Sequence, residues 1–204
     1  MRMNRTKFTW QEGLFTGAVL LLLPAEAAAH LVTTGMGPVY DGIGHLLLTP
    51  EDLVPVLALA LYAGLRGSTA GRRTMFLLPL AWLAGGIAGL SVEINFPLPF
   101  PTISFMLLGL LAATDLRLPA SVVPTLAVGV GVFHGFFNGS ALRDGGGLLG
   151  LVGIAIMIFV LAALASALVV AVEKTWARIA VRVAGSWIFA SGLLMLGWLI
   201  RRTE

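Results

Sequence analysis

The sequence predicts an all-α membrane protein, a polytopic bundle of transmembrane helices. Of its 204 residues, 58% are hydrophobic and only 11% are charged, whereas soluble domains average about 45–50% apolar and about 25% charged residues. The mean hydropathy is +0.95. The apolar residues stand in runs of about 20, the length that a helix needs to cross a bilayer. We therefore expect a single transmembrane domain over residues 30–204, with the lipid bilayer as its surroundings.

The first 29 residues have the three parts of a secretory signal peptide. Basic residues among the first seven precede an apolar run at 13–24, and small alanines close the segment. We expect residues 1–29 to be a cleavable signal peptide, which would make His30 the new N-terminus. Cleavage two residues earlier is also compatible with the sequence. The alternative is an uncleaved first helix, which would raise the expected number of spans from six to seven.

After His30, hydropathy marks six apolar runs that we expect to be the membrane helices. The linkers between them are too short to separate domains. The runs cover residues 40–65, 75–92, 99–114, 120–138, 148–172 and 180–200.

Basic residues predict the orientation, because Lys and Arg concentrate in cytoplasmic loops. With residue 30 outside, seven basic residues of the linkers fall inside and three fall outside, so we expect an outer mature N-terminus. The net charge is only +3, and we interpret the basic residues at the span ends as signals of orientation. Nucleic acid is therefore not an expected partner. The inner residues are Arg66, Arg72, Arg73, Arg117, Lys174, Arg178 and Arg182.

All three histidines are expected at the outer membrane face. His45 lies about five residues inside the first span and His134 about four inside the fourth, so both should be roughly 6–9 Å deep. His30 would be on the same side. An ionisable side chain within a span faces the protein interior and is a candidate functional residue. Because the chain has no Cys, a metal ion here would be held by nitrogen and oxygen, which suits Ni, Co, Cu or Zn.

Two polar pairs have the spacing of one helical turn. Asp41 precedes His45 by four residues, and Asn138 follows His134 by four, so each pair shares one face of its helix. Asp41 and His45 could bind one cation, or the carboxylate could orient the imidazole. The alternative for Asp41 is that it caps the helix N-terminus.

Three further carboxylates are additional candidate ligands. Glu51 and Asp52 follow Pro50 inside the first run, where a continuous helix would place them near the middle of the bilayer. Because proline disrupts a helix interior, we favour a helix broken at this point, with Thr49 capping the new helix. Glu93, at the outer end of the second run, could complete a metal shell or be a solvated residue at the helix end.

These motifs resemble those of the HupE/UreJ family, small bacterial membrane proteins associated with hydrogenase and urease gene clusters and implicated in nickel uptake. The family has a histidine near the mature N-terminus, a first-helix motif H-P-x-x-G-x-D-H-L-L and a later F-H-G-x-A-H-G-x-E. The chain keeps Gly42, His45, Leu46 and Leu47 of the first, and Phe133, His134, Gly135 and Gly139 of the second. It departs from the family motifs at Pro38, Gly44, Asn138 and Ala141.

Two functions from different classes are compatible with this sequence. The first, which the resemblance favours, is a nickel or cobalt permease or accessory protein of the bacterial inner membrane. Its outward-facing metal ligands would be His30, Asp41, His45 and His134. The resemblance also implies a second copy of the chain or metalloenzyme maturation proteins as partners. The second is an intramembrane hydrolase, in which three histidines hold zinc and Asp41 is the general base.

Overall fold

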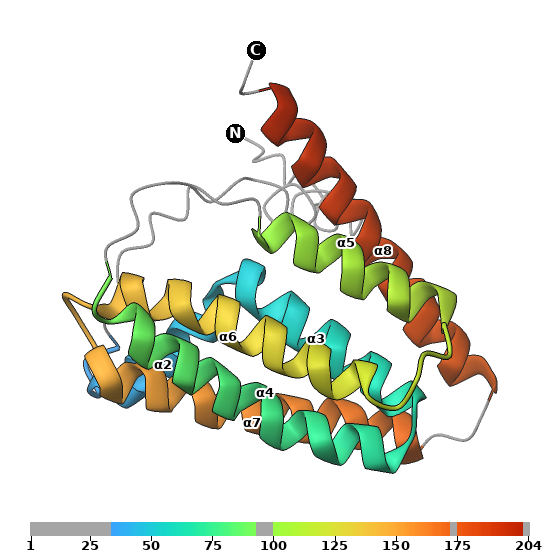
Figure 1. Ribbon diagram of the computed structural model, residues 1–204, viewed down its shortest axis with the longest axis horizontal. Helices are drawn as coiled ribbons and strands as arrows, with labels where there is room; N and C mark the ends of the chain where they lie inside the picture. The colour runs from blue at the N-terminus through green and yellow to red at the C-terminus, as the bar shows by residue number, and fades with distance from the viewer. Residues whose placement is uncertain (1–33, 93–99, 172–174, 202–204) are drawn as a thin grey trace, which may run out of the picture. The chain divides into compact units, whose positions relative to one another are not determined.

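The computed structural model describes residues 34–92, 100–171 and 175–201, and every regular element in these ranges is an α-helix. The all-α prediction is therefore confirmed for this part of the chain. The predicted signal peptide, His30 and Glu93 lie outside the described residues. The helices, which belong to one compact unit, are α2 (Pro38–Leu48), α3 (Pro50–Leu65), α4 (Ser68–Gly89), α5 (Phe100–Thr114), α6 (Val122–Leu142), α7 (Gly147–Ala171) and α8 (Thr175–Arg201) (Figure 1).

Several of these helices are long and apolar enough to cross a membrane. Within the described ranges, three helices meet both criteria: α6, α7 and the Arg178–Arg201 part of α8. The bent pair of α2 and α3 counts as a fourth if it forms one span, and α5 is a shorter apolar helix of 15 residues. A helical membrane protein is thus supported, while the number of six spans stays a prediction.

Two predicted starts are wrong, because hydropathy detects the apolar part of a helix and not its first turns. Helix α4 begins at Ser68, seven residues before the apolar run, and includes Arg72 and Arg73. Arginine is a good helix former, so these charges do not end the helix. The helix starts where Gly67 has a φ of 103°, a conformation that favours glycine. Helix α8 likewise begins at Thr175, ahead of its apolar run.

The first predicted span is broken, as the prolines indicated. Helices α2 and α3 meet at Thr49 with an angle of 77° between them. Pro50 is the first residue of α3, where its missing N–H costs no hydrogen bond. The predicted side-chain cap is absent, and the contact of Thr49 with the first turn is through its backbone carbonyl, which accepts the N–H groups of Asp52 and Leu53. The break places Glu51 and Asp52 in the first turn of α3, where the helix dipole favours negative charge.

Helices α4 and α6 pack with their backbones in direct contact. A Cβ atom added at Gly135 would lie 2.0 Å from the carbonyl oxygen of Trp82, and one at Gly139 would lie 2.0 Å from that of Gly86. Such close approach requires glycine, and small residues are typical of helix contacts in membranes. This contact fixes the position of His134, the neighbour of Gly135, against α4.

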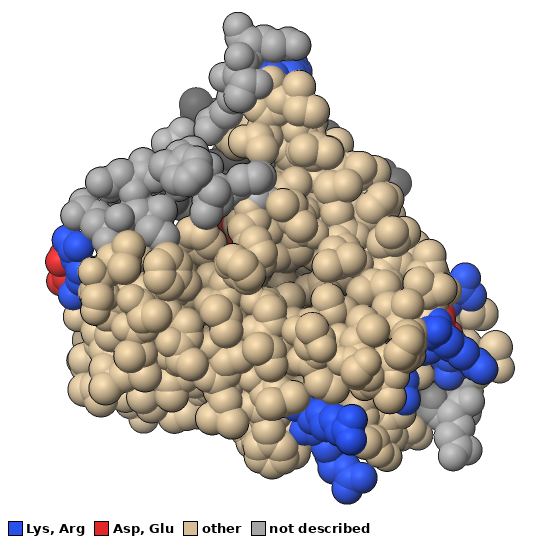
Figure 2. Space-filling view, in the orientation of Figure 1, with Lys and Arg blue, Asp and Glu red and all other residues tan. Residues whose placement is uncertain are grey.

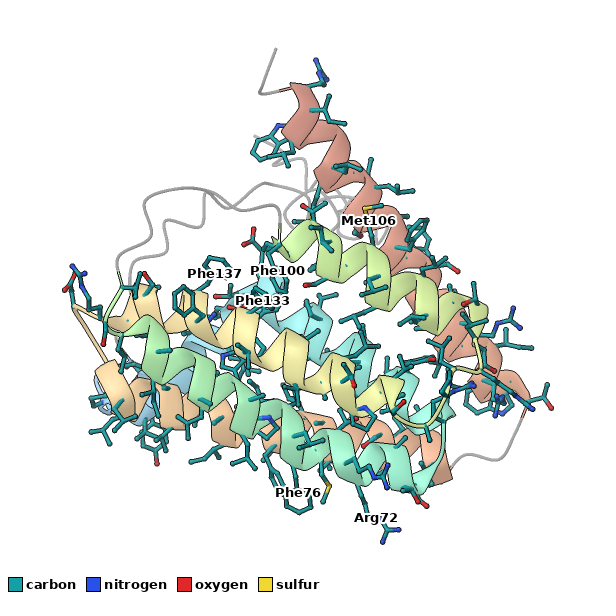
Figure 3. The ribbon with its side chains drawn as sticks, viewed as in Figure 1. Arg72, Phe76, Phe100, Met106, Phe133 and Phe137 are labelled. Atoms are coloured by element: carbon teal, nitrogen blue, oxygen red, sulfur yellow. The ribbon has the colours of Figure 1, made fainter. Side chains whose placement is uncertain are left out.

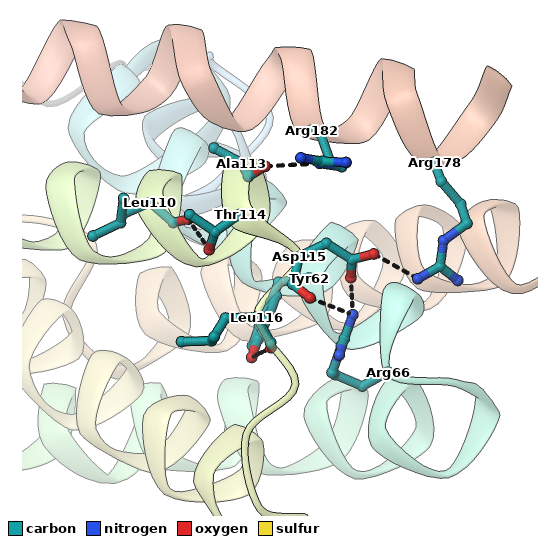
Figure 4. A network of polar contacts seen from close by, with 9 residues as sticks. All are labelled: Tyr62, Arg66, Leu110, Ala113, Thr114, Asp115, Leu116, Arg178 and Arg182. Atoms are coloured by element: carbon teal, nitrogen blue, oxygen red, sulfur yellow. Dashed lines mark hydrogen bonds and ion pairs between the residues drawn. The ribbon is translucent and has the colours of Figure 1, made fainter. Parts of the chain in front are cut away.

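An ion-pair network links the segment between α5 and α6 with both α3 and α8 (Figure 4). The carboxylate of Asp115 pairs with Arg66, just after α3, and lies 2.5 Å from a guanidinium nitrogen of Arg178 on α8. The Tyr62 hydroxyl donates a hydrogen bond of 2.7 Å to the backbone carbonyl that follows Asp115. Burial lowers the pKa of Arg66, and the ion pair with Asp115 compensates part of the cost of burying this guanidinium group.

Arginines gather at the ends of helices. In Figure 2 the blue side chains lie at the borders of a face that is otherwise almost free of charge. Arg72 and Arg73 are at the start of α4, Arg117 is in the connection between α5 and α6, and Arg182 is near the start of α8. Successive helices that run back and forth bring these segments to one end of the bundle, and the prediction that this end faces the cytoplasm stays a prediction.

Candidate functional site

A buried carboxylate, Asp52, joins helices α3 and α6. Its side chain is almost completely buried, with 6% of the residue exposed. The Oδ1 atom lies 2.8 Å from Nδ1 of His134, and Oδ2 accepts a hydrogen bond of 2.9 Å from the amide nitrogen of Asn138. The two α6 residues four positions apart therefore do share a face, and that face holds a carboxylate from another helix.

The second ring nitrogen of His134 extends this network to α5. Its Nε2 atom is 3.0 Å from the hydroxyl of Ser104, which is also 3.0 Å from the carbonyl oxygen of Phe100. An ionised carboxylate can only accept hydrogen bonds, so Nδ1 of His134 is the donor to Asp52 in that state. The hydroxyl of Ser104 then either donates to Nε2, or accepts from it while donating to Phe100.

His45 approaches the same carboxylate from α2. Its Nε2 atom lies 3.9 Å from Oδ2 of Asp52, which is too long for a hydrogen bond. The bend between α2 and α3 makes this approach possible. The structure thus brings His45 and His134, which are far apart in the sequence, to one carboxyl group. His134 lies about 12 Å along the axis from the end of α6, because the helix continues to Leu142.

Asp41 binds the segment that precedes α2 through its side chain. Its Oδ1 accepts hydrogen bonds from the backbone N–H of Thr34 at 2.5 Å and from the Thr34 hydroxyl at 2.7 Å. The N-cap of α2 is Gly37, so the prediction that Asp41 caps this helix is wrong. The carboxylate instead ties the preceding segment to the first turns of α2. Its role as a metal ligand stays a prediction, and Glu51, beside Asp52, is exposed.

One buried acceptor at the site is unused. The side-chain oxygen of Asn138 is buried and has no hydrogen-bond partner among the described residues, whereas the amide nitrogen binds Asp52 and the His134 carbonyl. An unsatisfied buried acceptor is rare and needs an explanation, such as a bound ion. Across the described ranges, no three His, Cys, Asp or Glu side chains are arranged to hold a metal ion together.

Aromatic rings enclose His134. The ring of Trp82 on α4 stacks on the imidazole at a centroid distance of 5.2 Å, and Phe100 meets it edge-on at 5.1 Å. Phe100 also stacks on Phe133 at 4.8 Å and lies 6.3 Å from Phe137. Figure 3 shows these three phenylalanines together where α5 begins beside α6. The imidazole is therefore shielded on two sides, which strengthens its electrostatic interactions.

Ser104 and Trp82 are not predicted from the sequence, and Asp52 is predicted only as an additional candidate ligand. Ser104 is a single hydroxyl in an apolar run, and such residues often bond only to their own helix. Nothing in the local pattern indicates that Trp82 faces a histidine. The signal that was available for Asp52 was its place directly after the proline break, where the helix changes direction.

The comparisons with known proteins give one result. Residues 18–195 match the model of the family described as HupE / UreJ protein. A search of curated proteins and a search of solved structures found no significant match. Because the matched range covers most of the chain, including every residue of the Asp52 site, the protein belongs to the HupE/UreJ family.

Proposed function

We propose that this HupE/UreJ protein is a permease for a divalent transition metal ion, nickel or cobalt, which binds beside Asp52. The observation that carries the proposal is a buried carboxylate beside two potential metal-binding atoms that form no hydrogen bond with any described residue. These are Nε2 of His45, 3.9 Å away, and the unpaired side-chain oxygen of Asn138. Family membership supports nickel or cobalt as the cargo.

The chemistry of these groups suits such an ion. Imidazole nitrogen and carboxylate or amide oxygen bind Ni, Co, Cu and Zn, and affinity alone does not select among them. The carboxylate of Asp52 neutralises part of the charge of an ion that has left water for the bilayer interior. His134 orients this carboxylate through its Nδ1–H, as outer partners of metal ligands commonly do.

The position of the site along the bundle supports access from the outer side. Asp52 is in the first turn of α3, and Arg66 follows the last turn, about 21 Å further along the helix axis. The arginine-rich end is the expected cytoplasmic end. In this orientation the ion enters near the α2–α3 break. His30 and Glu93, which lie outside the described residues, and Asp41 remain proposed as residues that capture the ion before it reaches Asp52.

Metal binding and uptake by purified protein test the proposal. For uptake, the protein is reconstituted into vesicles and the entry of nickel or cobalt is followed over time. For binding, the metal content of the detergent-purified protein is measured. We expect His45→Ala and Asp52→Asn to lose both binding and uptake, because each removes a donor atom or the compensating charge. The matched control is Asp144→Asn, which removes an equal charge from a side chain that is 85% exposed.

The outcomes separate the two functions. Readily exchanged nickel or cobalt that depends on His45 and Asp52 supports the permease. A stoichiometric, non-exchanging zinc would instead favour the hydrolase, and binding that is equal in Asp52→Asn and Asp144→Asn would refute the proposed site. Binding without uptake would leave the site in place and reject transport in favour of an accessory role.

A further inference from the structure

An open groove lies on the surface of the bundle at the start of α4, and its residues are different from those around Asp52. Its volume is about 620 Å³. Thr69, Arg72, Arg73 and Phe76 line it from one face of α4, at spacings of three and four residues. Leu77, also on α4, and Pro124 of α6 complete the wall. Figure 3 places the labelled Arg72 and Phe76 on the same side of α4.

The charges in this groove have no counter-ion among the residues that the structure describes. Arg72 and Arg73 are both exposed, and neither has a hydrogen bond or ion pair with any described residue. This contrasts with Arg66 and Arg178, which share Asp115. Two adjacent unpaired guanidinium groups form a strong site for a phosphate group, because guanidinium matches phosphate geometry with paired hydrogen bonds.

The rest of the groove is apolar. Phe76 is 52% exposed, and its ring rests 5.6 Å from that of Phe159 on α7. Leu77 and Pro124 add aliphatic surface beside it. A free phosphate ion would leave this surface without a partner, whereas a molecule with a phosphate at one end and hydrocarbon at the other would match both parts.

We propose that this groove binds one anionic phospholipid from the leaflet on the arginine-rich side of the membrane. The phosphodiester lies between Arg72 and Arg73, and the upper part of an acyl chain runs along Phe76 and Pro124. This site is independent of the metal ion and does not rest on the proposed permease function. Its effect is to anchor the start of α4, and through α4 the face that packs against His134.

Native mass spectrometry of the detergent-purified full chain tests this site, with phosphatidylglycerol, phosphatidylcholine and inorganic phosphate as probes. We expect wild-type protein to retain one phosphatidylglycerol in preference to phosphatidylcholine. The double variant R72Q/R73Q should bind it about 30-fold more weakly, the equivalent of about 1 kcal/mol for each arginine near an anionic surface. Phe76→Ala should also weaken lipid binding, and inorganic phosphate should not displace the lipid.

The control is R117Q/R201Q, which removes the same charge from exposed positions outside the groove. It should retain wild-type lipid binding, and thermal unfolding without added lipid should show that all variants are folded. An equal loss of phosphatidylglycerol binding in the control would show that the effect depends only on net charge and would overturn the proposal. Displacement by inorganic phosphate, or equal binding of phosphatidylcholine, would also overturn it.

Discussion

Replacement of Gly135 by alanine should push helices α4 and α6 apart. The new Cβ atom would lie 2.0 Å from the Trp82 carbonyl oxygen and 2.8 Å from the Trp82 Cα, and ordinary contact begins at 3.4 Å. The helices must therefore separate locally by about 1.4 Å. The obstructing atoms are backbone, which cannot rotate away as a flexible side chain would. Overpacking costs typically 1–3 kcal/mol, and we expect about 3 kcal/mol here.

The same helix offers a matched control in Gly129. A Cβ atom added there meets nothing within 4 Å, so Gly129→Ala should leave stability within about 1 kcal/mol of wild type or raise it through helix propensity. Unfolding of both variants by titration with a denaturing detergent, followed by circular dichroism, measures the difference. Because Trp82 stacks on His134, Gly135→Ala should also weaken metal binding. Equal stability of the two variants would refute the reasoning from close packing.

Two further substitutions test the polar networks. Asp115→Asn should lower the free energy of unfolding by about 1–3 kcal/mol, because it leaves the partly buried Arg66 without its ion-pair partner. The control is Asp144→Asn, for which unfolding by detergent titration should show a change below about 0.5 kcal/mol. Similar values for the two variants would argue against the network. Ser104→Ala removes one hydrogen-bond partner of His134 and should cost about 1 kcal/mol, while isothermal titration should find metal affinity within a few-fold of wild type. A complete loss of metal binding in Ser104→Ala would instead identify the hydroxyl as a ligand.

Local patterns in the sequence were sufficient to predict the all-helical class and the break between α2 and α3. Long apolar runs predict membrane helices because the bilayer offers no partner for exposed backbone groups. Pro50 predicts the start of α3 because proline lacks the N–H that an interior helical position uses. The half-matched motifs around His45 and His134 were also enough to identify the family, which the match over residues 18–195 confirmed.

The sequence by itself determined that this is a helical membrane protein of the HupE/UreJ family with isolated polar residues in its spans. Only the tertiary structure decided which of them meet. Asp52 and His134 are 82 positions apart, and hydropathy reports spacing within a helix, not which helices are neighbours. That choice depends on backbone contacts such as Gly135 against Trp82, and on the 77° bend between α2 and α3 beside which His45 approaches Asp52. The same folding brings Thr34 to the carboxylate of Asp41, a contact that helical spacing within α2 does not indicate.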